Sequence, residues 1–510
     1  MLSSAISGGV LGVDAFRVDV EVDVARALPA FSVVGLPDNA VKESKDRVKA
    51  AIKNSGHAFP PHRITVNLAP ADVKKEGAAY DLPMALAILA TDRTLRLEGL
   101  DRVLVLGELS LDGSVRPVRG VLPIASEALR LGVSALCVPR DNAAEAAVVP
   151  GLEVFAADTL GQVVEGLQRG SLERVTVDAE ALFAARHASA EDLSEVRGQG
   201  HVKRALEVAA AGGHNLLMVG PPGSGKTMLA RRLATILPAM QWEEALETSR
   251  IYSVTGLTDG AHPLVVHRPF RSPHHTISDA GLIGGGSSPR CGEISLAHNG
   301  VLFLDELPEF KKHVLEVLRQ PLEDGRVTIA RAANSITFPA RFMLVGAMNP
   351  CPCGYHGDPL HPCTCMPAEI RRYRGKVSGP LLDRFDLHVE VPAVRYREMV
   401  DPVAEESSAA VRGRVAYARE AQSRRSRGSR GNCNAQLSPA AVRRYCAPEA
   451  DAGVVLQHAM DRLGLSARAY TRTLKVARTL ADLDGGDRVG RRHVLEALQF
   501  RCPALLDSLG

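Results

Sequence analysis

The chain is poor in aromatic residues and has no long apolar run. Only 4% of its 510 residues are aromatic, and tryptophan occurs once. No apolar run is long enough to cross a bilayer, and the N-terminus lacks the basic and then apolar stretches of a secretory signal. We therefore expect a cytoplasmic protein that does not enter a membrane.

Cysteine is also scarce, and neither sign of charge dominates. Nine cysteines in a chain of this length do not form a disulfide framework, so we expect reduced thiols whose clustering matters. The formal net charge of +3 is too small to indicate a partner by itself. At 510 residues, with 45% of them hydrophobic, the chain can bury several cores, and a prior of about 150 residues per domain suggests three domains.

A glycine-rich segment has the composition and order of a phosphate-binding loop. Glycines let the backbone turn tightly enough to point N–H groups at triphosphate oxygens, and a following helix N-terminus also favours an anion. An apolar run over 215–219 predicts the preceding strand, and apolar residues at helical spacing predict a helix from Lys226 to the stop at Pro238. The loop consists of Gly220, Pro221, Pro222, Gly223, Ser224, Gly225, Lys226 and Thr227.

A second apolar run, over 301–304, ends in two acidic residues. Asp305 is expected to complete a Mg²⁺ shell to which the Thr227 hydroxyl contributes, and Glu306 to polarise the attacking water. Lys226 is expected to reach the β- and γ-phosphates. The two motifs together predict an ATP hydrolase with Mg²⁺ as its cofactor.

Residues 1–170 are predicted to form a separate α/β unit without nucleotide-binding signals. Its elements include a strand over 63–68 and a hairpin over 103–118 that turns at Asp112 and Gly113. A helix is expected over 122–131, closed by a glycine.

The remainder is predicted to contain a nucleotide-binding part and a helical lid. A polar connection over 171–192 leads to residues 193–395, where alternating strands and helices predict a parallel, three-layer α/β sheet. One helix of this part is expected to begin at Phe310. Residues 396–510 are predicted to form an α-helical lid, with its clearest helix over 466–483. The strands are expected over 215–219, 301–304, 342–347 and 387–391.

Several motifs carry a family resemblance over the whole chain. The loop, the acidic strand end, Asn349 after the strand over 343–348, and the segment 378–387 together resemble the magnesium-chelatase-like branch of AAA+ ATPases. The segments 31–37, 41–48 and 292–300 are more closely similar to the ComM/YifB family. This resemblance implies a Lon-protease-like N-terminal domain joined to a chelatase-type ATPase, in a family with a member implicated in DNA branch migration during natural transformation.

The resemblance also implies roles for individual residues. Asn349 corresponds to sensor 1, a polar side chain that helps to place water near the γ-phosphate. Arg384 corresponds to the arginine finger, which reaches the nucleotide of a neighbouring subunit and therefore implies a ring, expected to be a homo-hexamer. Arg468 is the expected sensor 2, and Arg472, one turn later, is the alternative.

Basic residues point to DNA as the partner. By the same resemblance, a hairpin over 326–339 enters the ring pore and carries Arg331 near its tip. One cation per subunit would then contact phosphates without sequence preference, although a purely structural hairpin is the alternative. Arginines also outnumber acids over 411–445, with a basic loop at 423–431, and a solvated connection would have the same composition.

The candidate metal ligands are four cysteines in two C-x-C pairs directly after the sensor-1 position. Four thiolates can hold Zn²⁺ tetrahedrally and tie down a loop rich in glycine and proline. Reduced thiols or a redox-labile cluster are the alternatives, because the spacing is not the common C-x-x-C. His356 and His361 lie inside the loop and could replace a cysteine, whereas His274 and His275 are expected to be structural or to form an interface, without a metal. The four cysteines are Cys351, Cys353, Cys363 and Cys365.

The N-terminal part resembles a Lon-type peptidase without its reactive groups. The likeness is carried by residues 74–80 and 107–113, and it places Ala79 at the serine and Leu122 at the lysine. Alanine has no hydroxyl and leucine has no base, so we expect the fold without protease activity.

The sequence thus predicts a ring-forming AAA+ ATPase that couples ATP hydrolysis to movement on DNA, as a branch-migration helicase in transformation or recombination. The alternatives are a magnesium-chelatase motor subunit and a protein-remodelling ATPase. Against the chelatase stands the N-terminal part, in which we expect no likeness to the chelatase motor subunit. DNA-stimulated ATP turnover separates the first hypothesis from the other two.

Overall fold

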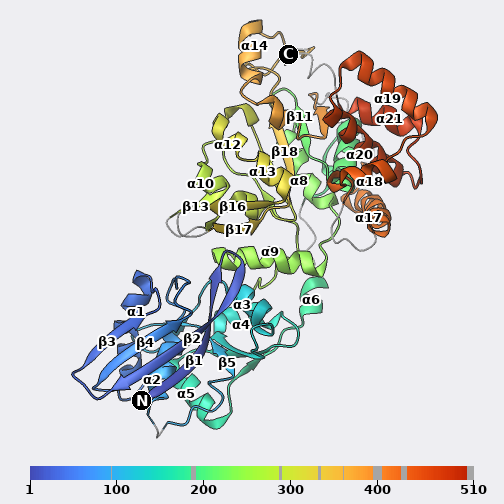
Figure 1. The fold of residues 1–510 in the computed structure, drawn as a ribbon. Coiled ribbons are helices and arrows are strands. Elements are labelled where there is room, and N and C mark those ends of the chain that lie inside the picture. Colours follow the sequence, from blue (N-terminus) through green and yellow to red (C-terminus); the bar gives the residue numbers. More distant parts are fainter. Residues whose placement is uncertain are drawn as a thin grey trace. The chain divides into compact units, whose positions relative to one another are not determined.

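The computed structural model describes most of the chain, which divides into two compact units (Figure 1). The first unit contains Met1–Arg186, Gln241–Val266 and Ala330–Phe338, and the second contains His187–Met240, His267–Ile329 and Pro339–Gly510. None of the helices in the described ranges combines the length and the apolarity needed to cross a bilayer. The described ranges are 1–92, 95–184, 191–286, 290–330, 335–359, 361–393, 405–426 and 433–501.

The first unit is built on an eight-stranded mixed sheet. Its strands are β1 (Leu2–Leu11), β2 (Asp14–Ala25), β3 (Ala30–Val34), β4 (Arg63–Ala69), β5 (Val103–Val105), β8 (Ala135–Pro139), β9 (Glu153–Ala157) and β10 (Arg174–Val175). They lie in the order β10-β9-β8-β5-β1-β2-β4-β3. The valines of β2 alternate with polar residues and are buried, as expected for a strand whose one face lies on a core.

Helices of the first unit come from two distant stretches of chain. Helix α9 belongs to this unit although it follows the phosphate-binding loop in sequence, and it packs on α3 through Trp242 and Leu246. The N–H of Gly120 donates to the carbonyl of Ser253 at 3.2 Å. The helices are α1 (Asn39–Asn54), α2 (Asp81–Leu89), α3 (Val121–Ala128), α4 (Arg140–Ala147), α5 (Leu160–Arg169), α6 (Ala179–Ala184) and α9 (Trp242–Thr255).

The predicted elements of the first unit are present with shifted ends. The strand predicted over 63–68 is confirmed as β4. The predicted hairpin is shorter, because only β6 (Glu108–Leu109) and β7 (Val115–Arg116) pair across the turn, whereas β5 joins the large sheet. Helix α3 ends at Ala128, so the predicted end at residue 131 was wrong: the last residues form turns instead.

The second unit contains the predicted parallel sheet. Its strands are β11 (Leu216–Val219), β12 (Phe270–Arg271), β15 (Val301–Leu304), β18 (Met343–Met348) and β19 (Leu387–Glu390). They lie in the order β12-β15-β18-β11-β19, and every neighbouring pair is parallel. The carboxyl ends of all five strands therefore meet at one edge of the sheet.

Both faces of this sheet are buried, which gives the predicted three layers. Alternate residues of β11, β15 and β18 join different hydrophobic clusters: in β15, Val301 and Phe303 face one, and Leu302 and Leu304 the other. The first face packs on α7 (Gly200–Gly212) and α8 (Lys226–Ile236). The second packs on α10 (Asp279–Leu282), α11 (Glu293–Leu296), α12 (Lys312–Glu316), α14 (Pro367–Arg374) and α15 (Gly379–Leu382).

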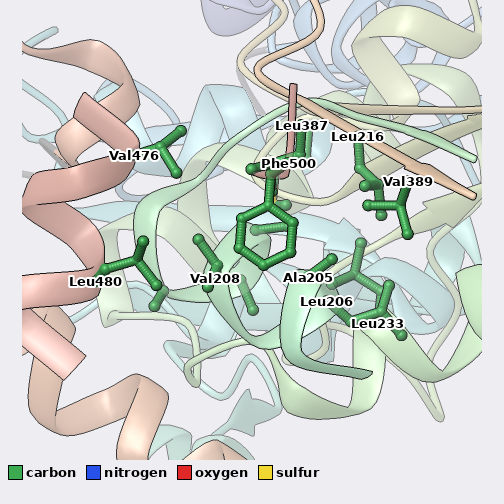
Figure 2. Packing of buried hydrophobic residues seen from close by; sticks show 14 of the residues in the cluster. Ala205, Leu206, Val208, Leu216, Leu233, Leu387, Val389, Val476, Leu480 and Phe500 are labelled. Atoms are coloured by element: carbon green, nitrogen blue, oxygen red, sulfur yellow. The ribbon is translucent and has the colours of Figure 1, made fainter. Parts of the chain in front are cut away.

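The C-terminal helices pack on the first face and form the predicted helical lid. Figure 2 shows Val476, Leu480 and Phe500 beside residues from the sheet and from α7. Helix α20 begins after Ser466, whose side chain accepts a hydrogen bond from the N–H of Ala469. The helices are α17 (Ser408–Arg425), α18 (Pro439–Tyr445), α19 (Ala450–Leu463), α20 (Ala467–Leu483) and α21 (Arg491–Gln499).

The single helix predicted from Phe310 was wrong. The chain forms the 3₁₀ turn η2 (Leu307–Glu309), then α12, and then a separate helix, α13 (Arg319–Asp324). Pro321 explains the break, because it has no N–H to donate to the carbonyl of Val317 and its ring would clash there. The remaining short elements are β13 (Gly284–Gly285), β14 (Arg290–Cys291), β16 (Arg326–Ala330), β17 (Ser335–Pro339), η1 (Leu193–Glu195) and η3 (Asn434–Gln436).

A buried carboxylate ties the lid to the sheet. Asp386, at the start of β19, pairs with Arg472 of α20 and accepts hydrogen bonds from the ring of His214 and the N–H of Asn215. Burial alone would raise the pKa of Asp386, but the hydrogen bond from His214 and the charge of Arg472 hold it below its usual range. The ionised form is therefore the one that the fold stabilises.

We predict that Asp386→Asn lowers the free energy of unfolding at pH 7 by about 3 kcal/mol, because Arg472 and His214 lose their ionic partner. The pKa of this carboxylate is lower in the folded than in the unfolded protein. Its contribution to the free energy of unfolding is therefore complete above the unfolded pKa of about 3.9, and it is lost as the pH falls below that value. Urea denaturation should therefore show a difference between variant and wild type that shrinks below about pH 4.

The matched control is Asp461→Asn on α19, which changes an exposed carboxylate in the lid. It should unfold at the wild-type urea concentration. An Asp386→Asn protein as stable as this control at pH 7 would contradict the role of the buried ion pair.

Candidate nucleotide-binding site

The predicted phosphate-binding loop connects β11 to α8. Gly223 and Gly225 have φ angles of 74° and 86°, which other residues rarely adopt. A Cβ on Gly220 would lie 2.1 Å from the carbonyl oxygen of Val391. Glycine is therefore required at these three positions, and the first N–H groups of α8 are left without partners inside the helix.

The side chain of Lys226 lies folded into the loop. Its Nζ donates to the carbonyls of Gly220 and Pro221, both at 2.8 Å, and to Oδ1 of Asn349 at 3.2 Å. Burial lowers the pKa of Lys226, while the charges of Asp305 and Glu306 oppose that change. A cation at the centre of a glycine loop suits the oxygens of a triphosphate, so the residues fit ATP.

Thr227 and Asp305 meet although they follow different strands, β11 and β15, and β18 lies between these two strands in the sheet. The hydroxyl of Thr227 donates to Oδ2 of Asp305 at 2.6 Å. The other oxygen, Oδ1, accepts from the N–H of Glu306 at 2.9 Å. Hydroxyl and carboxylate oxygens are the ligands that Mg²⁺ prefers, so this pair fits the predicted metal position.

Glu306 has an unusual backbone and a partner that the sequence did not indicate. Its φ of 52° is uncommon for a residue with a side chain, and its side chain is 59% exposed. Nδ1 of His275 lies 3.5 Å from Oε2 of Glu306. His275 was expected to be structural or to form an interface, because nothing in the sequence shows that β12 lies next to β15.

The structure thus brings most of the predicted nucleotide-site residues together. The loop follows β11, Asp305 and Glu306 follow β15, and Asn349 follows β18. The contacts of Lys226 with Asn349, and of Thr227 with Asp305, join these three strand ends.

Arg384 lies away from this group of contacts. Its side chain is 7% exposed, and its guanidinium pairs with Glu323 and donates to the carbonyl of Pro380 at 2.6 Å. Burial lowers the pKa of Arg384; the charge of Glu323 opposes this, and the nearby charges of three other arginines lower it further. Those residues are Arg319, Arg468 and Arg472.

The two candidates for sensor 2 differ in their surroundings. Arg468 is exposed on α20. Arg472 is already bound to Asp386 and to the carbonyl of Arg384, the latter at 3.1 Å. Arg472 is therefore part of the buried lid contact, and Arg468 stays the predicted sensor 2.

The predicted DNA-binding residues are described only in part. Strands β16 and β17 form the predicted two-stranded sheet, but Arg331 lies outside the described residues, as does most of the basic loop at 423–431. Two arginines of α17 pair with acids of the same chain: Arg414 pairs with Glu207 and Glu406, and Arg425 pairs with Asp482. These two residues therefore have a structural use, whereas Arg424 is exposed.

The four cysteines after Asn349 gather at one point. Their sulfur atoms all lie within 4.8 Å of one another, and none is in a disulfide. His356 and His361 do not belong to this group; His361 instead lies near Asp358. The donor set is therefore four thiols, Cys351, Cys353, Cys363 and Cys365.

Ala79 and Leu122, which the resemblance places at the serine and the lysine of a peptidase, pack in one hydrophobic cluster. Leu122 is buried, and its N–H donates to Glu145 at 3.1 Å and to the hydroxyl of Ser253 at 3.3 Å. Trp242 of α9 packs in the same cluster. Both side chains are therefore surrounded by apolar contacts.

We predict that Lys226→Ala reduces ATP hydrolysis by about a hundredfold or more, because the loop loses the charge that would neutralise the transferring phosphate. Phosphate release measured on the purified full chain checks this. Lys312→Ala, which removes an exposed lysine on α12, should hydrolyse ATP at the wild-type rate. Full activity in Lys226→Ala would show that hydrolysis occurs elsewhere.

Three protein-family models match the chain. Residues 192–399 match "Magnesium chelatase, subunit ChlI", and residues 405–501 match its C-terminal model. Residues 20–142 match "Subunit ChlI of Mg-chelatase". The last match does not agree with our expectation that the N-terminal part has no likeness to a chelatase subunit.

Curated relatives match over nearly the whole chain. The chain is 45% identical to YifB of Escherichia coli K12, over 98% of this chain and 97% of that protein. It is also 45% identical to the competence protein ComM of Haemophilus influenzae, over the same shares. The magnesium-chelatase 38 kDa subunit of Cereibacter sphaeroides is 27% identical, over 59% of this chain and 88% of that subunit. The chain, with its assembled phosphate loop and acidic strand end, therefore belongs to the ComM/YifB family of magnesium-chelatase-like AAA+ ATPases.

Proposed function

We propose that this protein is a ring-forming motor that couples ATP hydrolysis to movement on DNA, as a branch-migration helicase in transformation or recombination. The observation that carries the proposal is the joined loop, acidic strand end and Asn349 in a chain related over its whole length to a competence protein. ATP with Mg²⁺ is the cofactor that the family implies, and the donor set at the loop fits it.

The proposed roles follow from the positions of the side chains. Lys226 and the loop N–H groups would hold the phosphates, and Thr227 and Asp305 would hold Mg²⁺, which supplies charge neutralisation. Glu306 would accept a proton from the attacking water, and Asn349 would orient that water. The contact with His275 would then hold the Glu306 carboxylate when no water is being activated.

The ring is supported by the surroundings of Arg384. Four arginines lie near one another here, and among the described residues three paired acids, Glu323, Glu316 and Asp386, accompany them, so the group keeps a net positive charge that suits an anion from outside the subunit. A nucleotide bound by a neighbouring copy is such an anion. Arg384 would leave Glu323 to reach it, and a head-to-tail arrangement of this kind closes into a ring.

The DNA contact is proposed for the β16–β17 hairpin, with Arg331 as its phosphate-binding residue. Four arginines of α17, Arg412, Arg414, Arg419 and Arg425, are not part of the proposal, since they bind groups of the same chain. The likeness to the chelatase 38 kDa subunit favours a second candidate, a motor that remodels a partner protein. That motor would respond to a protein and not to DNA.

The N-terminal unit is proposed to have no peptidase activity. Neither Ala79 nor Leu122 can supply a nucleophile or a base, and both lie in an apolar cluster with α9. The four clustered cysteines are proposed to hold a structural Zn²⁺, because four thiols within reach of one ion are a donor set that zinc prefers.

We predict that Arg331→Ala keeps basal ATP hydrolysis and loses its stimulation by branched or single-stranded DNA. The logarithm of the DNA-binding constant falls linearly with the logarithm of the salt concentration, and each lost phosphate contact should reduce this slope by about one unit. Arg462→Ala, which removes an exposed lid arginine, is the control. DNA stimulation equal to wild type in Arg331→Ala would remove the hairpin from the proposal.

Mixing two inactive proteins tests the shared site. Glu306→Gln and Arg384→Ala copies should each be inactive alone, whereas mixed rings should regain activity at about one quarter of their interfaces, where both residues are intact. Glu306→Gln mixed with Lys226→Ala should regain none, because both changes lie on the same side of the interface. Mixed rings that stay inactive in the first case would contradict catalysis between subunits.

A further inference from the structure

The spacing of the four sulfur atoms matches one tetrahedral ion. Zinc–sulfur bonds of about 2.3 Å place the sulfurs of a tetrahedral site about 3.8 Å apart. The sulfur of Cys351 lies 3.3 Å from that of Cys353 and 3.7 Å from that of Cys363, and the last two are 3.6 Å apart. A disulfide would be about 2.05 Å, and a cluster of several irons would separate the thiolates further.

Backbone groups already bind these sulfur atoms. The N–H of Cys353 donates to the sulfur of Cys365 at 3.3 Å, and Tyr355 and Thr364 donate backbone hydrogen bonds to Cys353. Such bonds orient thiolates around a metal and spread their negative charge. Four thiolates with Zn²⁺ carry a net charge of −2, and the buried guanidinium of Arg374 lies close enough to Cys351 for their charges to interact.

The cysteine loop is attached to Asn349 from both ends. Cys351 follows Asn349 after a single residue, Pro350. After Cys365 the chain enters α14, whose last turn returns to the same place: Arg374 donates to the carbonyl of Pro350 at 2.8 Å, and Tyr373 accepts a hydrogen bond from the backbone of Asn349. An ion joining the two cysteine pairs would therefore close a rigid ring around Asn349.

The same loop contacts the phosphate-binding loop. Gly354, between the two cysteine pairs, has a φ of 90°, and a Cβ there would lie 2.5 Å from Cδ of Pro222. Pro222 belongs to the phosphate-binding loop, and Asn349 bonds to Lys226 of that loop at 3.2 Å. The cysteine loop thus supports both sides of the candidate ATP site.

We infer that a Zn²⁺ ion bound by Cys351, Cys353, Cys363 and Cys365 fixes Asn349 and the phosphate-binding loop in their working positions, so that ATP turnover depends on zinc. The four thiolates are the ligands, and zinc acts through the chain without touching the nucleotide. The inference rests on the proposed ATPase activity but not on DNA binding.

The metal is tested on the unaltered full chain. Metal analysis of protein purified without chelators should find one zinc per chain, and zinc-edge X-ray absorption should find four sulfur ligands at about 2.3 Å. Absence of zinc, iron in its place, or a ligand shell containing nitrogen would overturn the site. These results do not depend on hydrolysis or on DNA.

Cys353→Ser tests the link to catalysis. It should lose zinc, and its kcat for ATP should fall about tenfold while KM changes less than about threefold, because positioning and not binding is impaired. Adding Asn349→Ala should lower kcat little further, since both changes disturb one unit. Cys291→Ser, at a half-buried cysteine outside the group, should keep zinc and kcat.

Gly354→Ala covers the case in which Cys353→Ser fails to fold. It should retain one zinc per chain and still lower kcat, because the new methyl group would displace Pro222. Full kcat in a zinc-free Cys353→Ser protein, or full kcat in Gly354→Ala, would overturn the positioning role. If DNA did not stimulate ATP hydrolysis by the wild-type protein, the proposed function would be contradicted, but this inference would still stand.

Discussion

The candidate ATP site depends on three parallel strands that end at one edge of a single sheet. Strand β18 pairs with β15 on one side and with β11 on the other. This pairing alone places Asn349 between the loop and the acids, since the three segments are far apart in sequence. The contacts of Lys226 and Thr227 then join the strand ends. A change in strand order would separate these groups without altering any local motif.

Burial on both faces holds that sheet in place. Alternate residues of β15 and β18 enter two different clusters, so the strands cannot slip by one residue without exchanging the clusters. The lid shares the first cluster (Figure 2), as Val476 and Leu480 show. The ion pair between Asp386 and Arg472 adds a specific polar contact between lid and sheet. Apolar packing supplies most of the stability, and the buried charge specifies the docking of α20.

One part of the chain supports the site from outside the strand ends, and another, between two segments of the second unit, belongs to the first unit. The cysteine loop leaves the end of β18 and returns through α14 to Asn349. The segment containing α9 follows α8 but belongs to the first unit, where it packs in the cluster that contains Ala79 and Leu122. Both residues that the resemblance places at peptidase positions therefore lie among apolar side chains.

The sequence by itself determined the local elements whose causes are local. Glycine spacing, apolar runs and capping residues were enough to predict the loop, β4, α8, α20 and the parallel sheet, since these depend on neighbouring residues. Tertiary structure alone decided the rest: the His275 contact with Glu306, the burial of Arg384 against Glu323, the exclusion of His356 and His361 from the group of four sulfur atoms, and the place of α9. Each joins residues distant in sequence, and such contacts are set by the packing of whole elements, which no local pattern encodes.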